Sequence, residues 1–329
     1  MKKFINDPAN VVPDALRGLA LAHRDILSVN EKPIFVARAR RKGNKVALVS
    51  GGGSGHEPLH AGFVGYGMLD AACPGHVFTS PTPDQITAAA EAVAGGPGVL
   101  FIVKNSSGDM MNFEMAAELF TQPSATVLVQ DDVAVESSTW STSRRGVAGT
   151  LVVEKIVVAA AEAGANLVAC AALGKRVAGA CATMGVALTS CTVPAAGKPT
   201  FDLAENEMEL GVGIHGEPGR RRVPMAPAAA VADDLVGAIV RDLAPRKGEP
   251  LLLLVNGFGG TPLLELYIMF DAAARRLLAD GCTIARSLVG NFVTSLEMAG
   301  CSITIARLDD EMLKLWDAPV QTAALRWGR

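Results

Sequence analysis

Short apolar runs that end in polar or glycine-rich loops recur along the first half of the chain. Residues 46–50, 99–103 and 126–129 form such runs, rich in β-branched side chains, and predict buried strands. A helical pattern follows Thr82 and Pro83, which are typical of a helix N-terminus. Because strands alternate with helices, the pattern predicts α/β layers, each with a mixed or mostly parallel sheet flanked by helices.

Two more helices are expected in this half. Asp109 stands where an N-cap would, ahead of an apolar-periodic run over residues 110–120. The alanine-rich stretch 149–172 predicts one long helix, too apolar to be exposed to water on all sides.

The second half of the chain continues the same α/β pattern. Residues 181–192 are β-rich, and residues 251–255 predict a strand that turns through glycines into a helix capped by Thr261 and Pro262. Residues 302–306 predict a further strand, which precedes a short helix capped by Asp309.

The chain length indicates two domains. At about 100–200 residues per domain, 329 residues are too many for one average domain. We place the boundary near residue 185, which gives α/β domains over 1–184 and 185–329.

Composition narrows the class of protein. Half of the residues are hydrophobic and the formal net charge is −3 without a basic block, which argues against nucleic acid and against an anionic membrane surface. No run reaches the about 20 apolar residues of a transmembrane helix, and the first residues are unlike a signal peptide. Six cysteines occur without a C-x-x-C pair, which is typical of reduced thiols. We therefore expect a soluble, cytoplasmic protein.

A glycine-rich loop, Gly-Gly-Gly-Ser-Gly-His-Glu-Pro over 51–58, follows the first predicted strand. Ligands in open α/β sheets bind at the carboxyl ends of strands, and glycines let backbone N–H groups approach them. The loop fails the Walker A, dinucleotide and nucleophile-elbow patterns, because His56 stands where each needs glycine. A tight packing turn is one interpretation; the adjacent His-Glu-Pro favours a ligand-binding loop.

Two of the five histidines, His56 and His215, lie in glycine-rich loops next to a Glu-Pro pair. Glycine neighbours leave an imidazole open to a ligand, and histidine titrates near physiological pH. Both are therefore candidate functional residues. A zinc hydrolase is a lesser hypothesis, because residues 56–60 match H-E-x-x-H but contain Pro58 and follow glycines; His60 can equally be a buried core residue.

Asp109 has two interpretations that the residues leave open. As an N-cap it would stabilise its helix by about 1 kcal/mol. Lys104 ends the preceding strand, however, and a carboxylate beside a lysine at a strand end can serve as a general base.

These motifs together resemble the dihydroxyacetone kinase family, in order and over nearly the whole chain. The matching segments are Gly51-Gly52-Gly53-Ser54-Gly55-His56-Glu57-Pro58, the stretch 77–85, Lys104-Asn105 with Gly108-Asp109, and the stretches 144–150, 213–219, 294–300 and 315–319.

The resemblance implies roles for particular residues. His215 matches the histidine that adds to the ketone carbonyl and holds the substrate as a hemiaminal. His56 matches the residue that assists at the carbonyl oxygen, and Asp109 the group that accepts the proton of the attacking hydroxyl. Gly53, Ser80, Lys104 and Asp109 match positions that hydrogen-bond the substrate hydroxyls. A covalent adduct would fix the substrate in a near-attack geometry and exclude glycerol, which has no carbonyl.

The resemblance also implies partners. No nucleotide loop is found, so we expect no cofactor on this chain; ADP or ATP with Mg²⁺ would arrive on an L subunit, recharged in bacteria by a phosphotransferase system. A homodimer is expected. The family often has an aromatic residue and a threonine where this chain has Ser106-Ser107, which leaves a four-carbon ketose such as erythrulose open as substrate. A non-catalytic regulatory paralogue is the alternative from another class.

Overall fold

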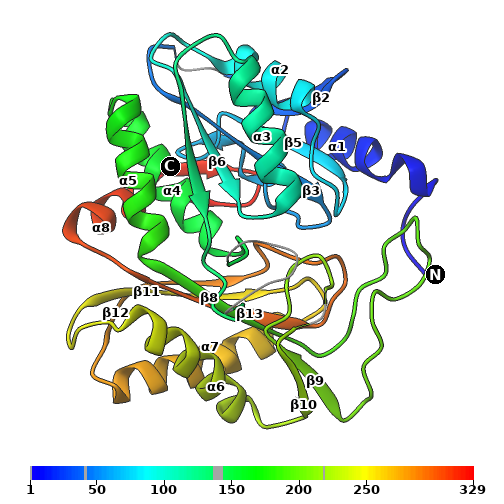
Figure 1. Cartoon of the computed structure of the whole chain (residues 1–329), viewed down its shortest axis with the longest axis vertical. Helices are drawn as coiled ribbons and strands as arrows, with labels where there is room; N and C mark the ends of the chain where they lie inside the picture. Colours follow the sequence, from blue (N-terminus) through cyan, green and yellow to red (C-terminus); the bar gives the residue numbers. More distant parts are fainter. Residues whose placement is uncertain (1, 41–42, 136–143, 218) are drawn as a thin grey trace.

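The protein is built on two six-stranded sheets with helices around and between them (Figure 1). The structure, a computed structural model, describes residues 2–40, 43–135, 144–217 and 219–329. Both sheets are mixed and flanked by helices, which confirms the α/β class expected from the sequence.

The first sheet carries the three strands that the apolar runs predicted. In spatial order it consists of β1 (Leu27–Glu31), β2 (Ile34–Arg38), β5 (Ala71–Val77), β3 (Ala47–Ser54), β6 (Val99–Lys104) and β7 (Ser124–Val129). The strands β5, β3, β6 and β7 run parallel, whereas β1 and β2 pair antiparallel. The carboxyl ends of β3 and β6 therefore lie side by side, and their loops can form one site.

The second sheet is mostly antiparallel. In spatial order it consists of β10 (Arg221–Pro224), β9 (Glu207–Leu210), β8 (Cys181–Ala187), β13 (Gly300–Arg307), β11 (Pro250–Gly257) and β12 (Thr283–Gly290). Among the described strands of this sheet, only β11 and β12 pair in parallel.

The proposed division at residue 185 falls inside β8, which pairs with β13 of the second sheet along its length. A small third sheet also returns the end of the chain to the first half, and it consists of β15 (Arg326–Trp327), β14 (Val320–Thr322) and β4 (Gly65–Tyr66). The division into two domains stays a prediction.

The helices cover both sheets and fill the space between them. They are α1 (Val11–Ala22), α2 (Pro83–Val93), α3 (Ser107–Leu119), α4 (Gly149–Glu162), α5 (Leu167–Gly179), α6 (Ala228–Leu243), α7 (Leu263–Ala279) and α8 (Asp310–Asp317), with 3-10 turns at Pro8–Asn10 and Ala61–Phe63. The helix starts expected at Thr82 and Asp309 are confirmed, by a capping box with Gln85 and by a hydrogen bond from Met312 N to Asp309 Oδ1 of 2.8 Å.

Two helix predictions were wrong. Ser106, not Asp109, is the N-cap residue of α3, because extended backbone at Ser106 allows the helix to begin three residues earlier. The stretch 149–172 forms two helices rather than one. The chain turns at Gly164, whose φ is 97°, and α5 begins anew after Asn166, whose side chain accepts a hydrogen bond from Ala169 N.

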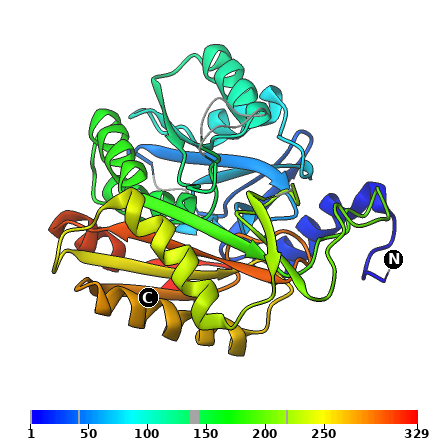
Figure 2. The same cartoon turned by 60° about the horizontal axis from the view of Figure 1, so that its bottom comes forward.

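The central core joins the two sheets. The helix α4 lies between them, and its Ile156 belongs to one apolar cluster with Ile102 of the first sheet and Leu254 of the second. Separate clusters lie under α2 and α3 on the outer face of the first sheet and under α6 and α7 on the outer face of the second (Figures 1 and 2). This packing fixes the strand ends of the first sheet relative to loops of the second.

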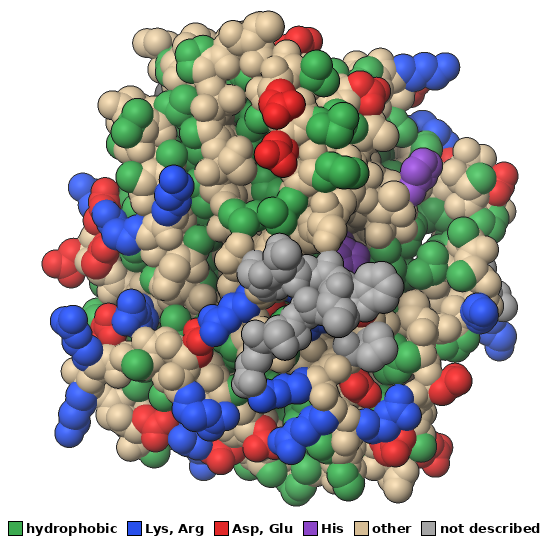
Figure 3. Space-filling model, in the orientation of Figure 1, with side chains coloured by type: hydrophobic (Ala, Val, Ile, Leu, Met, Phe, Trp, Pro, Cys, Tyr) green, Lys and Arg blue, Asp and Glu red, His purple; other side chains and the backbone are tan. Residues whose placement is uncertain are grey.

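In the view of Figure 3 the basic side chains lie mainly on the lower half of the surface, with acidic side chains among them. Among the described residues, no helix is long and apolar enough to cross a membrane.

Candidate functional site

The glycine-rich segment 51–58 is only partly a loop, because Gly51–Ser54 continue β3 and pair with β5. The remaining residues, 55–58, leave the strand and are held by a loop from the second sheet. Leu296 N donates to Gly55 O at 2.8 Å, and Thr294 N donates to His56 O at 3.2 Å. The loop 291–300 is itself fixed by Asn256, whose Oδ1 accepts from Phe292 N at 2.9 Å and from Val293 N at 2.8 Å. Asn256, near the end of β11, therefore fixes the loop that holds residues 55 and 56, a role that sequence patterns did not reveal.

The ring of His56 is buried in one defined orientation. Its Nδ1 lies 2.8 Å from Thr294 O, and since a carbonyl only accepts, the ring proton lies on Nδ1. Nε2 is buried without a hydrogen-bond partner among the described residues. Burial, together with the nearby His215 and Lys104, lowers the pKa of His56 well below 6.5. At neutral pH His56 thus presents an unoccupied lone pair on Nε2.

The structure places His215 beside His56, from the opposite sheet. The ring centroids lie 4.8 Å apart, nearly edge-on. Phe78 completes the group, stacked on His56 at 5.2 Å and edge-on to His215 at 5.7 Å. The His215 side chain keeps 28% of its surface exposed, whereas His56 is fully buried. An incoming ligand can therefore reach the ring of His215.

Glu217 orients the loop that carries His215. Its Oε2 accepts from the backbone N of His215 at 2.8 Å, its Oε1 lies 3.9 Å from His215 Nδ1, and Arg145 Nη1 lies 3.1 Å from the same oxygen. Burial acts to raise the pKa of Glu217, but the interactions with His215 and Arg145 outweigh it and lower the pKa to about 2. A carboxylate therefore faces Nδ1 of His215. Pro218 of this loop lies outside the described residues.

Lys104 and Asp109 form the second group of predicted site residues. Lys104 Nζ lies 3.3 Å from Asp109 Oδ2 and donates to Gly51 O at 3.1 Å. Both side chains are buried, and Asp109 Oδ1 has no hydrogen-bond partner among the described residues. A Cβ at Gly52 would lie 2.3 Å from Lys104 Nζ, so a larger residue there would displace the ammonium from this position. Asp109 occupies the first turn of α3, where the helix dipole favours a carboxylate.

Gly53 and Ser80 border these groups. A Cβ on Gly53 would lie 2.6 Å from Thr79 N, so only glycine allows β3 to approach the segment that contains Phe78 and Ser80. A Cβ on Gly108 would lie 2.6 Å from Ser80 Oγ, which places that hydroxyl beside the first turn of α3. The predicted residues thus lie around one segment, 51–56, with the two histidines in one group and Lys104 with Asp109 in the other.

The geometry at His60 contradicts the zinc hypothesis. Residues 57–60 form turns rather than the helix of an H-E-x-x-H site. The two nitrogens of His60 are engaged, Nε2 by Lys104 Nζ at 2.9 Å and Nδ1 by Glu154 Oε1 at 2.8 Å. An ammonium group occupies the lone pair that a metal ion would need.

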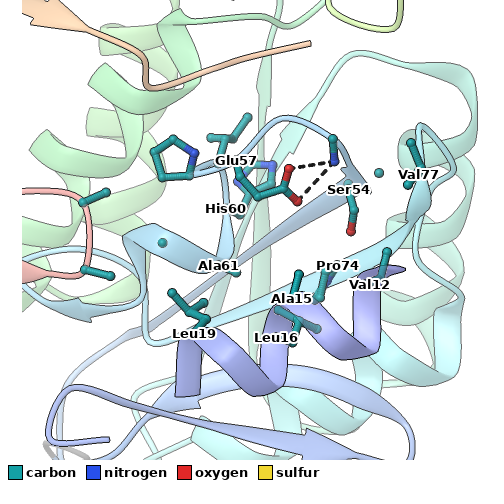
Figure 4. Close-up of a pocket in the computed structure, with 18 of the residues that line it drawn as sticks. Val12, Ala15, Leu16, Leu19, Ser54, Glu57, His60, Ala61, Pro74 and Val77 are labelled. Carbon is teal, nitrogen blue, oxygen red and sulfur yellow. Dashed lines mark hydrogen bonds between the residues drawn. The ribbon is translucent and has the colours of Figure 1, made fainter. Parts of the chain in front are cut away.

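A mainly apolar cavity of about 610 Å³ lies next to this site but is not lined by its catalytic candidates (Figure 4). Its walls come from α1, including Leu16 and Leu19, and from the segment 52–62. At its edge Glu57 accepts from Gly55 N at 2.9 Å, which fixes the turn before His56 (Figure 4).

The fold and site define an α/β protein whose glycine-rich loops bring a paired histidine group and a lysine–aspartate pair to one strand edge. Residues 17–324 match the Dak1 domain, and the chain belongs to this family of dihydroxyacetone kinases. It is 48% identical, over the full length of both chains, to the dihydroxyacetone-binding subunit DhaK of the PEP-dependent kinase of Escherichia coli. It is 50% identical to the DhaK subunit of a PTS-dependent kinase of Listeria innocua, over 98% of this chain and 100% of the relative.

Longer relatives and solved structures agree with this assignment. The chain is 42% identical to human triokinase/FMN cyclase, of which it spans 58%. The dihydroxyacetone kinase of C. freundii, solved with AMP-PNP and Mg²⁺, superposes with a TM-score of 0.90 at 35% identity, covering 98% of this chain and 60% of that one. The operon co-activator DhaQ superposes with a TM-score of 0.89 at 33% identity, covering 94% and 96%.

Proposed function

We propose that this chain is the dihydroxyacetone-binding subunit of a dihydroxyacetone kinase, which holds the ketone covalently on His215 and presents a terminal hydroxyl for phosphorylation. The observation that carries the proposal is the pairing of an accessible His215 ring with a buried His56 ring whose Nε2 lone pair is unoccupied. A ketone carbonyl placed between the two rings has a nucleophile on one side and, on the other, an acceptor for the hydroxyl that the addition creates.

The adduct forms by addition of a ring nitrogen to the carbonyl carbon. The Glu217 carboxylate faces Nδ1 and favours a proton there, which leaves the lone pair of His215 on Nε2. Nε2 forms the new bond to carbon, the C=O π electrons move to oxygen, and this oxygen takes up a proton from water. The ring then gives its Nδ1 proton to the hydroxide left by that water, so the hemiaminal is neutral, and Glu217 stabilises the positive charge that the ring carries in between.

His56 assists at the former carbonyl oxygen as a hydrogen-bond acceptor. Because the ring proton of His56 lies on Nδ1 toward Thr294 and the pKa of His56 is lowered, Nε2 accepts a hydrogen bond from the hemiaminal hydroxyl and does not donate one. This stabilises the adduct without a charged group in a buried site.

Asp109 is the proposed general base for phosphoryl transfer. Its Oδ1 has no hydrogen-bond partner in the described part of the chain, and its Oδ2 faces the Lys104 ammonium. Oδ1 takes the proton of a terminal substrate hydroxyl while that oxygen attacks the terminal phosphorus of the donor nucleotide, whose P–O bond breaks and whose diphosphate leaves; reversal of the hemiaminal then releases dihydroxyacetone phosphate. Gly53, Ser80 and Lys104 border this position and are proposed to bind the hydroxyls.

The phosphoryl donor is proposed to be a nucleotide with Mg²⁺ on a partner L subunit, recharged by a phosphotransferase system. Support comes from the full-length match to relatives named as the dihydroxyacetone-binding subunits of PEP- or PTS-dependent kinases. We also propose that the chain forms a homodimer. Turnover of dihydroxyacetone should require the charged partner, and ATP-dependent turnover by this chain alone would contradict the division of labour.

Two alternatives remain testable with the same protein. Ser106 and Ser107 begin α3 beside Asp109, so erythrulose should be compared with dihydroxyacetone as adduct and as substrate. The likeness to an operon co-activator shows that this fold also serves regulation. A regulator would have no need of a buried carboxylate whose Oδ1 lacks a partner among the described residues, which favours the kinase subunit.

Asp109→Asn tests the proposed chemistry. An amide cannot accept the hydroxyl proton, so turnover with the charged partner should fall by about 10²–10⁴-fold, while the adduct still forms on His215. Asp84→Asn is the matched control, because Asp84 occupies the exposed first turn of α2 and should leave turnover unchanged. Near wild-type turnover by a folded Asp109→Asn protein would remove Asp109 from the base role.

A further inference from the structure

A chain of four buried polar side chains continues from the proposed base into the core. Asp109 Oδ2 lies 3.3 Å from Lys104 Nζ, which lies 2.9 Å from His60 Nε2, and His60 Nδ1 lies 2.8 Å from Glu154 Oε1. Each of the four residues has 5% or less of its surface exposed. Glu154 lies on α4, so the chain links the central helix to the first turn of α3.

The contacts of Lys104 fix which atoms carry protons. An ammonium group has three N–H donors and no acceptor, and here Gly51 O, His60 Nε2 and Asp109 Oδ2 all lie within reach. His60 Nε2 must therefore be the unprotonated nitrogen, and the proton on Nδ1 points at Glu154. Burial lowers the pKa of His60 well below 6.5, so the ring stays neutral and remains an acceptor across the physiological pH range.

Glu154 completes the charge balance of this group. Burial raises the pKa of Glu154 to about 8, so at neutral pH the residue is mostly protonated and its Oε1 accepts from His60. Lys104 and Asp109 then form one compensated ion pair. Buried polar groups of this kind seldom add stability compared with apolar side chains of the same size. Their role is therefore better sought in the groups that they orient.

We propose that His60 and Glu154 are positioning residues that hold the Lys104 ammonium against Oδ2 of Asp109 and so keep Oδ1 free as the proton acceptor. The inference rests on the proposed role of Asp109. Glu154 selects the ring tautomer of His60, His60 restrains Lys104, and Lys104 orients the carboxylate. Gly52 leaves room for the ammonium under β3.

The test compares kcat of a His60 variant that keeps a hydrogen-bond acceptor for Lys104 with kcat of a variant that only fills the space. His60→Leu fills the space but removes the acceptor for Lys104, and kcat with dihydroxyacetone and the charged partner should fall by about 10–100-fold, as expected when a buried ammonium loses one hydrogen-bond acceptor. Because Lys104 is also a proposed ligand of the substrate hydroxyls, KM for the ketone should rise by less than kcat falls, and adduct formation at His215 should stay close to wild type. His60→Gln, whose side-chain oxygen can reach Lys104, should restore most of kcat.

The same comparison at Glu154 uses Gln and Leu. Glu154→Gln keeps an oxygen for His60 Nδ1–H and should retain most of kcat, whereas Glu154→Leu should resemble His60→Leu. Equal kcat for the Leu and Gln variants of both residues, with differences only in melting temperature, would show a purely structural role and overturn the inference.

The variants of Asp109 and His60 together distinguish a failure of the positioning role from a failure of the proposed function. If Asp109→Asn abolishes turnover and His60→Leu does not, the positioning role fails and the base survives; if Asp109→Asn turns over normally, the proposed function itself fails. Nitrogen NMR of ¹⁵N-histidine-labelled protein measures the tautomer of His60 in the wild-type protein itself, and His60→Gln serves only to assign the signals. It should show His60 protonated on Nδ1 and bare on Nε2, and protonation on Nε2 would overturn the inference.

Discussion

The two histidine loops of this protein have similar sequences and opposite environments. His56 and His215 both stand next to a Glu-Pro pair among glycines, and each loop uses its glutamate to accept backbone N–H groups. Yet His56 is completely buried, with Nδ1 fixed on Thr294 O, while His215 keeps 28% of its side chain exposed and has an ionised carboxylate 3.9 Å from Nδ1.

The difference lies in what each loop packs against. The loop of His56 ends β3 and is covered by residues 294–296, which enclose its ring with Phe78. The loop of His215 follows β9 and is held from one side by Arg145 through Glu217. Two loops of similar composition can therefore provide a fixed hydrogen-bond acceptor in one place and an accessible nucleophile in another. Three measurements test which histidine has which role.

The largest effect is expected from removal of the nucleophile. His215→Ala should bind dihydroxyacetone at least about tenfold more weakly, a loss above about 1.4 kcal/mol, because the covalent bond to the carbonyl carbon is gone. Titration calorimetry gives the affinity. The control is His76→Ala, a histidine on the exposed surface, which should bind normally. Equal affinity of His215→Ala and wild type for dihydroxyacetone would show that His215 is not the nucleophile.

A smaller effect is expected at His56. His56→Asn keeps a donor for Thr294 O but removes Nε2, so the adduct should lose one hydrogen bond and the ketone affinity should fall by about 3–10-fold. The bound ketone should still be tetrahedral. A His56→Asn protein that binds the ketone but forms no adduct would move the nucleophile to His56.

The smallest effect concerns stability and pH. Burial holds the pKa of His56 and of His60 well below 6.5, so both stay neutral when folded but take up protons in the unfolded chain. The unfolded state then binds more protons below about pH 6.5, and the free energy of unfolding should fall as pH falls, by about 1 kcal/mol per histidine per pH unit. Urea unfolding at several pH values gives the free energy of unfolding, which should depend less steeply on pH for His56→Asn than for wild type. The same dependence on pH in both proteins would contradict the burial of a neutral His56.

The sequence predicted the elements that position the site better than it predicted the contacts. The strands ending at Ser54 and Lys104 and the helix start at Thr82 have strong local signals, namely β-branched runs, glycine loops and a capping box. Asp109 was misplaced as a cap because Ser106 offers an equally good N-cap three residues earlier. The break at Gly164 was hidden by continuous alanine-rich apolarity.

Long-range contacts were out of reach for sequence patterns. Phe78 adopts a φ of 56° and stacks on His56, and Glu154 comes from a helix whose apolar pattern gave no reason to single it out. His60 was considered only as a core residue or a zinc ligand, and its place between Lys104 and Glu154 depends on packing across the first sheet. Such partners are brought together by tertiary structure alone.

The central claim is the covalent bond between His215 and the ketone, and carbon NMR tests it most directly. Wild-type protein mixed with dihydroxyacetone labelled with ¹³C at the carbonyl carbon should show the bound carbonyl resonance replaced by that of a tetrahedral carbon. Its coupling to ¹⁵N-labelled histidine should be visible in wild type and lost in His215→Ala. A bound ketone that keeps its carbonyl resonance in the wild-type protein would contradict the account.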